Sequence, residues 1–106
     1  MIVGLDIDGT ISKHPELFRI LSKALRNEGH SVHIVTCRME PEHTEKDLES
    51  WGIEYDRLHL IPVQTDLSVA DWKRKVCEDE GLDFLFDDSP DVLISTPGRT
   101  HSIFVM

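Results

Sequence analysis

Short apolar segments alternate with amphipathic segments along almost the whole of this 106-residue chain. Brief runs of apolar, β-branched residues are typical of buried strands, whereas apolar residues spaced three and four apart are typical of helices. Strand-like segments occupy residues 2–7, 31–36, 56–63 and 82–88, and helix-like segments occupy residues 15–29, 41–52 and 68–81. Strands that alternate with helices predict a parallel sheet covered by helices on both faces. The sequence therefore predicts the α/β class, with a three-layer Rossmann-like arrangement.

The ends of these segments carry local signals. Pro15 and Pro41 suit the first positions of two helices, and all three helical segments end at a glycine. Ser68 and Asp71 form a capping-box pattern at the start of the third helix. Pro62 is expected to end the third strand because proline has no N–H to donate.

Two more apolar segments, 91–95 and 102–106, follow the fourth strand, with a turn expected at 96–99. One or both of these segments would add a strand at the edge of the sheet. The length leaves room for one domain, 1–106, and a hydrophobic content of 40% is enough for one core.

The net charge is −9, from 20 acidic and 11 basic residues. Sequence-independent binding to nucleic acids and to anionic membranes uses basic patches, so neither is expected to be strong here. No apolar segment approaches the ~20 residues of a membrane-spanning helix. Cys37 and Cys77 lack metal-binding spacing, and reduced thiols in a cytoplasmic protein are the simplest interpretation. The six histidines also show no metal-binding spacing and are interpreted as surface or strand residues.

Five acidic residues gather in two short clusters after predicted strands: Asp6, Asp8, Asp87, Asp88 and Asp91. Ligands of parallel sheets bind beyond the carboxyl ends of the strands, where these clusters are expected to meet. Crowded carboxylates raise each other's pKa and lower stability unless a cation lies between them. Mg²⁺ prefers oxygen ligands, so the sequence predicts a magnesium site at this edge.

The first acidic cluster has a pattern suited to such a site. Asp6 and Asp8 lie two residues apart, so on extended backbone both side chains would face one spot while Ile7 enters the core. Gly9 permits a sharp turn and brings its N–H close to a ligand. Thr36 ends the second strand and would add a hydroxyl at the same edge.

Together these motifs resemble those of the haloacid dehalogenase (HAD) superfamily of phosphohydrolases. The matching features are DIDGT at 6–10, Thr36, a lysine in the segment 68–81 and FLFDDSPD at 84–91, in the order found in that family. They cover the chain nearly from end to end. DxDGT combined with a late DD is specific, whereas either motif alone is common. The resemblance implies an Mg²⁺-dependent phosphomonoester phosphatase that works through an aspartyl phosphate.

The resemblance also implies roles for individual residues. Asp6 would be the nucleophile, and Asp8 the general acid and base, with its backbone carbonyl on the metal. Thr36 would hydrogen-bond the phosphoryl oxygens. Asp6 would also be a metal ligand, Asp88 would bind Mg²⁺ directly, and Asp87 would bind it through water or lie behind the direct ligands.

Supporting roles fall to neighbouring residues. Gly9 and Thr10 would belong to the phosphate site. Arg38 could contact a substrate phosphate or sugar, and a surface salt bridge is an equal alternative. Asp91 would support the site or cap a following turn.

Two lysines compete for the third motif. Helical geometry places Lys73 on the apolar face near Trp72 and Val76, whereas Lys75 points away. The family's lysine would be expected nearer the first turn, where Val69 stands. Lys73 is therefore the preferred residue, with Lys75 as the alternative.

The chain resembles the capless branch of the family, because only about 25 residues separate Thr10 from Thr36 and one helix and one strand use them. An open site would admit a phosphorylated small molecule or the exposed phosphate end of a larger substrate, or would rely on another subunit of a homo-oligomer for cover. The DDSPD motif resembles nucleotidase-like members. The alternative function is a catalytically weak or inactive HAD-like regulatory or binding domain. A receiver-like phosphoacceptor is disfavoured, because its acceptor aspartate lies on a later strand than its acid pair.

Overall fold

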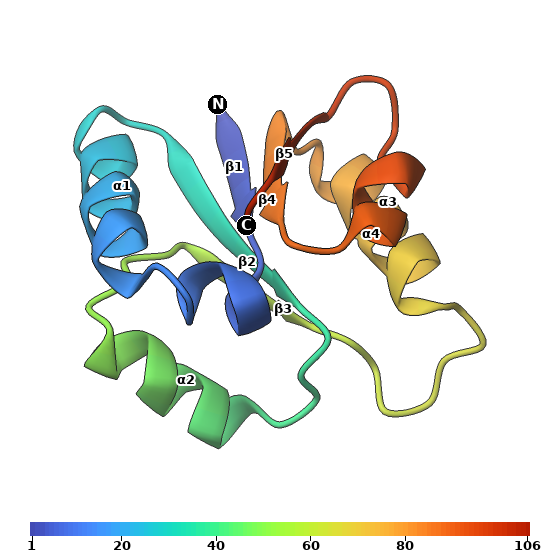
Figure 1. The fold of residues 1–106 in the computed structure, drawn as a ribbon, viewed down its shortest axis with the longest axis horizontal. Helices are drawn as coiled ribbons and strands as arrows, with labels where there is room; N and C mark the ends of the chain where they lie inside the picture. Colours follow the sequence, from blue (N-terminus) through green and yellow to red (C-terminus); the bar gives the residue numbers. More distant parts are fainter.

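A computed structural model describes all 106 residues. Five strands form one sheet in the order β3-β2-β1-β4-β5, and every neighbouring pair is parallel (Figure 1). The strands are β1 (Ile2–Leu5), β2 (Ser31–Thr36), β3 (Arg57–Leu60), β4 (Phe84–Asp87) and β5 (His101–Phe104). The predicted α/β class with a parallel, Rossmann-like sheet is confirmed.

Four helices and one short helical turn connect the strands. They are η1 (Ile7–Ile11), α1 (Pro15–Asn27), α2 (Pro41–Ser50), α3 (Val69–Glu80) and α4 (Pro90–Ser95). In Figure 1, α1 and α2 lie on one side of the sheet, and α3 and α4 lie on the other. None of these helices has the length and apolar character needed to cross a bilayer.

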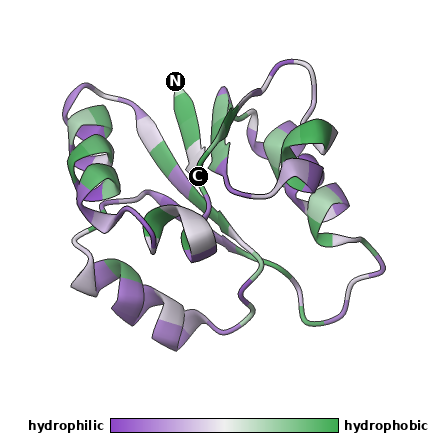
Figure 2. Ribbon diagram, in the orientation of Figure 1, coloured by the Kyte–Doolittle hydropathy of each residue, from purple (hydrophilic) through white to green (hydrophobic).

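Each face of the sheet has its own apolar core. Val32 and Ile34 of β2 pack on the α1–α2 side with Phe18, whereas Val35 packs on the α3–α4 side with Trp72. This division follows from the alternation of side chains along a strand. β1 and β4 at the sheet centre are coloured mostly as hydrophobic in Figure 2, as expected for strands buried on both faces.

The predicted helix starts are confirmed. Pro15 and Pro41 are the first residues of α1 and α2, and the Ser68 hydroxyl accepts a hydrogen bond from the Asp71 N–H at 3.1 Å. The Glu40 carboxylate also caps α2, a contact that the sequence did not predict. β3 ends at Leu60, before the proline that was expected to stop it.

Of the two late apolar segments, only the second adds the expected edge strand: β5, which begins at His101, overlaps 102–106. Residues Pro90–Ser95 form α4, with proline at the first helical position and Asp91 in the first turn. Because β4 and β5 are parallel, the chain must cross one face of the sheet between them. A helix that buries Val92 against the α3 side provides this crossover.

The first strand is shorter than predicted. It ends at Leu5, and Ile7–Ile11 form a tight helical turn interrupted by non-helical backbone at Asp8 and Gly9. Ile7 is fully buried, as expected. The turn therefore anchors its apolar ends in the core and presents the acidic residues at the carboxyl edge of the sheet.

Replacing a core residue should be costly. Leu85 on β4 is 0% exposed, so Leu85→Ala should lower the free energy of unfolding by about 2–5 kcal/mol through lost burial and the remaining cavity. Chemical denaturation with an unchanged m-value would measure this loss. Ile94→Ala is the control, because Ile94 is 82% exposed and its truncation should change stability little. Equal losses in both variants would contradict the described core.

Candidate functional site

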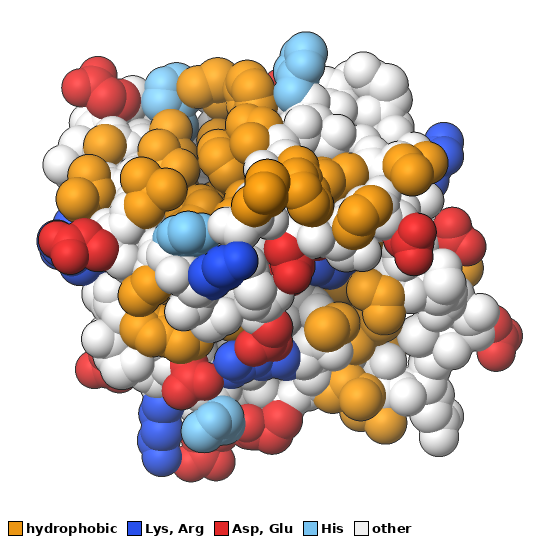
Figure 3. Space-filling model, viewed as in Figure 1, with side chains coloured by type: hydrophobic (Ala, Val, Ile, Leu, Met, Phe, Trp, Pro, Cys, Tyr) orange, Lys and Arg blue, Asp and Glu red, His pale blue; other side chains and the backbone are white.

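An open cleft of about 670 Å³ lies at the carboxyl edge of the sheet. Residues that follow β1, β2 and β4 line it, together with the first turns of α3 and α4. All five acidic residues of the two predicted clusters are among its lining residues, and so is Lys73. Acidic and basic side chains lie next to one another in the middle of the face shown in Figure 3. The topology therefore brings the predicted clusters to one place.

A buried ion-pair network joins α3 to two strand ends. The Lys73 Nζ donates to Asp6 Oδ1 at 2.8 Å and to Asp87 Oδ2 at 2.7 Å. All three side chains are at most 5% exposed. Lys75, the alternative lysine, instead pairs with Asp79 on the outer face of α3. The structure thus places Lys73 beside the predicted nucleophile.

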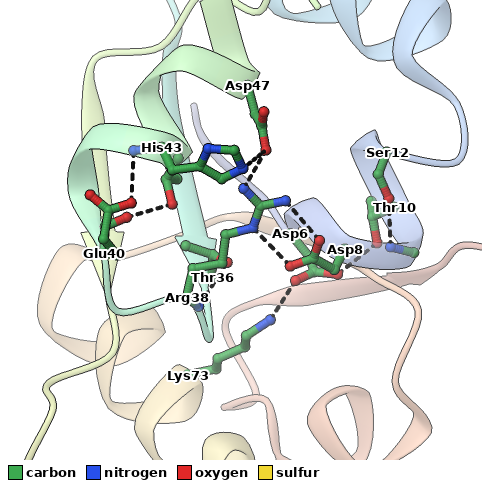
Figure 4. Close-up of polar contacts among 12 residues, drawn as sticks. Asp6, Asp8, Thr10, Ser12, Thr36, Arg38, Glu40, His43, Asp47 and Lys73 are labelled. Carbon is green, nitrogen blue, oxygen red and sulfur yellow. Dashed lines mark hydrogen bonds and ion pairs between the residues drawn. The ribbon is translucent and has the colours of Figure 1, made fainter.

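The Asp6 carboxylate is held at both oxygens. Its Oδ2 accepts a hydrogen bond from the Thr10 hydroxyl at 2.9 Å, while Oδ1 accepts from Lys73 (Figure 4). Burial raises the pKa of Asp6 to about 6, and Asp87 adds to this rise, although Lys73 and Thr10 oppose it. Burial alone would lower the pKa of Lys73, but the two carboxylates outweigh it and the net shift is upward. One ammonium between two carboxylates leaves one negative charge when all three groups are ionised.

Three carboxylates converge near this network. Asp6, Asp87 and Asp88 each have an oxygen within 4.8 Å of the others. Asp87 Oδ1 also accepts the backbone N–H of Ser89 at 2.9 Å. A set of oxygen donors, partly open to the cleft and short of positive charge, fits Mg²⁺. Asp6, Asp87 and Asp88 are therefore together. The Asp8 carboxylate lies outside this group, and binding of the metal by the Asp8 backbone carbonyl stays a prediction.

Gly9 makes the approach of Asp88 feasible. Its φ of 84° lies in the left-handed region, and a Cβ built there would collide with the carboxylate of Asp88. Its N–H donates to the Ser12 hydroxyl at 2.9 Å within the turn, and the expected approach of this N–H to a ligand stays a prediction. Glycine is required here because the Asp88 side chain occupies the space that a Cβ would fill.

Arg38 binds Asp8 through two parallel hydrogen bonds. Its Nε donates to Asp8 Oδ2 at 3.0 Å, and its second terminal nitrogen donates to Asp8 Oδ1 at 2.9 Å. The remaining terminal nitrogen donates to Asp47 at 2.7 Å (Figure 4). The hydrogen bonds from Arg38 lower the pKa of Asp8. Arg38 thus adopts the salt-bridge alternative, and Asp8 is held in its ionised form.

Three more of the predicted residues lie around these groups. Thr36 is fully buried at the end of β2, and its hydroxyl accepts the backbone N–H of Arg38 at 3.1 Å. It does not line the cleft. Asp91 is exposed in the first turn of α4 and does line the cleft. Thr10 binds Asp6 directly, so its observed role is to hold a carboxylate.

Sequence reasoning missed Asp47 as the second partner of Arg38. Asp47 lies on α2, which was interpreted only as a polar helix. The only feature of the sequence that indicated this contact was an arginine after the second strand followed by acidic residues in the next helical segment. Such a pattern is common on solvent-exposed surfaces. Only the packing of α2 beside the β2 end brings these groups together.

Searches against protein-family models and against curated proteins found no match. Two chains of known structure share the fold, one from "Structure of the Pnkp1/Rnl/Hen1 RNA repair complex" and one from "Structure of Pnkp1/Rnl/Hen1 complex". Their TM-scores are 0.80 and 0.77, both are 19% identical to this chain, and both matches cover 98% of it. This chain spans 42% and 45% of their lengths. At this level of identity, the likeness establishes the fold alone.

Removing the buried ammonium should destabilise the protein. Lys73→Met leaves Asp6 and Asp87 buried without their cation, which should lower the free energy of unfolding by about 3–5 kcal/mol at pH 7. The deficit should shrink as the pH falls, because protonation removes the uncompensated charge. Lys75→Met, which removes an exposed ion pair, should change the free energy of unfolding little. Similar losses for the two variants in urea denaturation would contradict the assignment.

The raised pKa of Asp6 gives a second prediction. A carboxyl group whose pKa rises on folding, here from 3.8 to about 6, binds its proton more tightly in the folded state. Its contribution therefore stabilises the fold at low pH and is lost as the pH rises from about 4 to about 6. In metal-free buffer, wild type should lose roughly 3 kcal/mol relative to Asp6→Asn over this range. A constant difference between the two proteins would show that Asp6 titrates normally.

Proposed function

We propose that this chain is a Mg²⁺-dependent phosphomonoester phosphatase of the HAD type, with Asp6 as the nucleophile. The observation that supports this proposal most is the Lys73 ammonium held between Asp6 and Asp87 at the floor of an open cleft. A lysine, two strand-end acids and a third acid at the rim match the motif roles that the sequence resemblance implies. We infer that Asp6, Asp87 and Asp88 would hold the metal.

The surroundings of Asp6 suit nucleophilic attack on phosphorus. With a pKa of about 6, the carboxylate is mostly ionised at pH 7 and remains basic enough to be a good nucleophile. Lys73 and Thr10 fix its orientation, and each oxygen keeps a second lone pair. When bound, Mg²⁺ would offset the repulsion between the carboxylate and a phosphate dianion. Attack would form the Asp6–phosphate bond and break the bond from phosphorus to the leaving alkoxide.

Asp8 requires a change before it can donate a proton. In the structure, Arg38 holds it ionised. A phosphate dianion in the cleft would compete for the guanidinium, since arginine binds phosphate and carboxylate with the same paired geometry. Loss of that contact would raise the pKa of Asp8, which could then protonate the leaving alkoxide and later accept a proton from the hydrolytic water.

The shape of the cleft bears on the substrate class. Its mouth is open, so a phosphate at the end of a large molecule can enter as readily as one on a small metabolite. Both structural neighbours come from Pnkp1/Rnl/Hen1 complexes, and one of these is described as an RNA repair complex. Their context supports testing phosphorylated nucleic-acid ends and partner proteins, while the net charge of −9 argues against strong binding of a nucleic-acid backbone.

One observation favours a second candidate, a regulatory or binding domain without catalysis. Both oxygens of Asp6 accept hydrogen bonds, and the negative charge of Asp8 is paired with the positive charge of Arg38. If no ligand releases Arg38, the chain would bind Mg²⁺ or phosphate without turnover.

A generic phosphatase assay separates these functions. Wild type should hydrolyse p-nitrophenyl phosphate with Mg²⁺ and lose this activity in EDTA, and Asp6→Asn should abolish it. Asp79→Asn is the matched control, because Asp79 lies on the outer face of α3 and should not affect turnover. Full activity in Asp6→Asn would contradict the nucleophile assignment. Magnesium binding without turnover on any phosphomonoester would favour the binding domain.

The glycine beneath Asp88 provides an independent test of the metal site. Gly9→Ala should destabilise the fold by about 1–2 kcal/mol because alanine is strained at positive φ. It should also weaken Mg²⁺ binding, measured by calorimetry, because the new methyl group displaces Asp88. Gly98→Ala is the control, since a Cβ there meets no atom within 4 Å. Unchanged Mg²⁺ affinity in Gly9→Ala would show that Asp88 is not a ligand.

A further inference from the structure

Two histidines and a glutamate meet on the α3 face of the sheet, outside the cleft. His33 lies on β2, His59 lies on β3, and Glu80 is the last residue of α3. The strand register pairs His59 with Val35, so the two histidines are diagonal neighbours two residues out of register. Residues at this diagonal spacing on one sheet face lie within reach of long side chains.

The donor atoms of these side chains point at one another. His33 Nδ1 lies 3.0 Å from His59 Nε2, which lies 3.4 Å from Glu80 Oε1. All three atoms are within 4.8 Å of one another. Zinc–nitrogen bonds of about 2.0–2.1 Å give neighbouring ligand atoms of a tetrahedral site a separation of about 3.3 Å. The observed spacing therefore suits a metal ion between the three atoms.

Hydrogen bonding alone accounts poorly for this arrangement. If His33 Nδ1 carries the proton, the lone pair of His59 Nε2 accepts it, and no proton is left to lie between His59 and the Glu80 carboxylate. If His59 Nε2 carries the proton, one N–H must serve both His33 and Glu80. A cation would satisfy all three lone pairs at once.

Burial keeps both imidazoles in the neutral form that binds metals. His33 is 6% exposed, and the His59 side chain is 18% exposed. Burial lowers the pKa of both histidines, so both are neutral at pH 7 and keep a lone pair for a metal. The Glu80 side chain, at 27% exposure, leaves a route from solvent.

We propose that His33, His59 and Glu80 form a binding site for a borderline divalent transition metal such as Zn²⁺, separate from the acidic cleft. Two imidazoles and one carboxylate are a donor set typical of zinc sites with one position left open to water. Magnesium would be disfavoured because it prefers oxygen ligands. The two sites would thus select different metals by donor chemistry.

Arg57 is the cation that competes for Glu80. Its guanidinium lies 3.7 Å from Glu80 Oε1, but its side chain is 67% exposed and can swing into solvent. A metal ion would displace it at little cost, because exposed ion pairs contribute little to stability. Arg57→Gln should therefore preserve or tighten metal binding.

The site connects to the cleft through α3. Glu80 and Lys73 are seven residues apart, so they lie on the same helix face about 10 Å apart along the axis. A metal bound by Glu80, His33 and His59 would link the end of α3 to β2 and β3. Because it would bind the folded state, it would raise the free energy of unfolding. This site is independent of the proposed phosphatase activity.

Cobalt(II) is the appropriate probe. With excess Mg²⁺ present, Co²⁺ added to the full chain should produce the intense visible bands of a four- or five-coordinate nitrogen-ligated ion, and Zn²⁺ should raise the melting temperature. His59→Gln and Glu80→Gln should each weaken Co²⁺ binding at least ~10-fold. Mutating a residue that only hydrogen-bonds a metal ligand already lowers metal affinity by this factor, and losing the ligand itself should lower it at least as much. Circular dichroism would verify that both variants fold.

Two variants serve as matched controls. Glu78→Gln lies on the same helix but pairs with Arg74 in solvent, and His101→Gln removes an exposed histidine of β5. Both should bind Co²⁺ as wild type does. Weak six-coordinate bands that persist in His59→Gln and disappear in Asp88→Asn would place the ion in the acidic cleft and overturn the proposal. No bands and no thermal shift in wild type would also overturn it.

Discussion

The ammonium of Lys73, held between Asp6 and Asp87, is the interaction on which the site depends. It links the first strand, the fourth strand and α3 at a point where all three side chains are buried. Without the lysine, two carboxylates would face each other away from water, which costs several kcal/mol. With it, the network still has an uncompensated negative charge beside Asp88. That deficit gives a divalent cation a physical reason to bind here.

The fold brings the members of this network together. Parallel strands deliver their carboxyl ends to one edge, and β1 lies directly beside β4, so Asp6 and Asp87 become neighbours. The crossover through α3 then brings Lys73 over the same edge. Gly9 and the turn at Ile7–Ile11 let Asp88 close over the backbone of the first motif.

Much of this was predictable from sequence because its signals are local. Apolar periodicity and proline or serine starts located the strands and three of the helices, and helical rotation selected Lys73 over Lys75. The failures involved information that only the assembled sheet supplies. Residues 91–95 look strand-like locally but must be a crossover helix between parallel strands. Asp47 meets Arg38, and His33 meets His59, through packing between segments 9 and 26 residues apart, without any motif spacing.

The arrangement thus combines a hydrogen-bonded acidic floor with an arginine that holds Asp8, a contact that we propose phosphate releases. The most direct test is the anomalous difference map of a crystal soaked with Mn²⁺, a scattering substitute for Mg²⁺, and a phosphate mimic. We expect one metal peak between the carboxylates of Asp6 and Asp88, with the mimic beside Asp6. A crystal of the folded protein in which those two carboxylates lie far apart, with no metal peak between them, would contradict the proposed metal site.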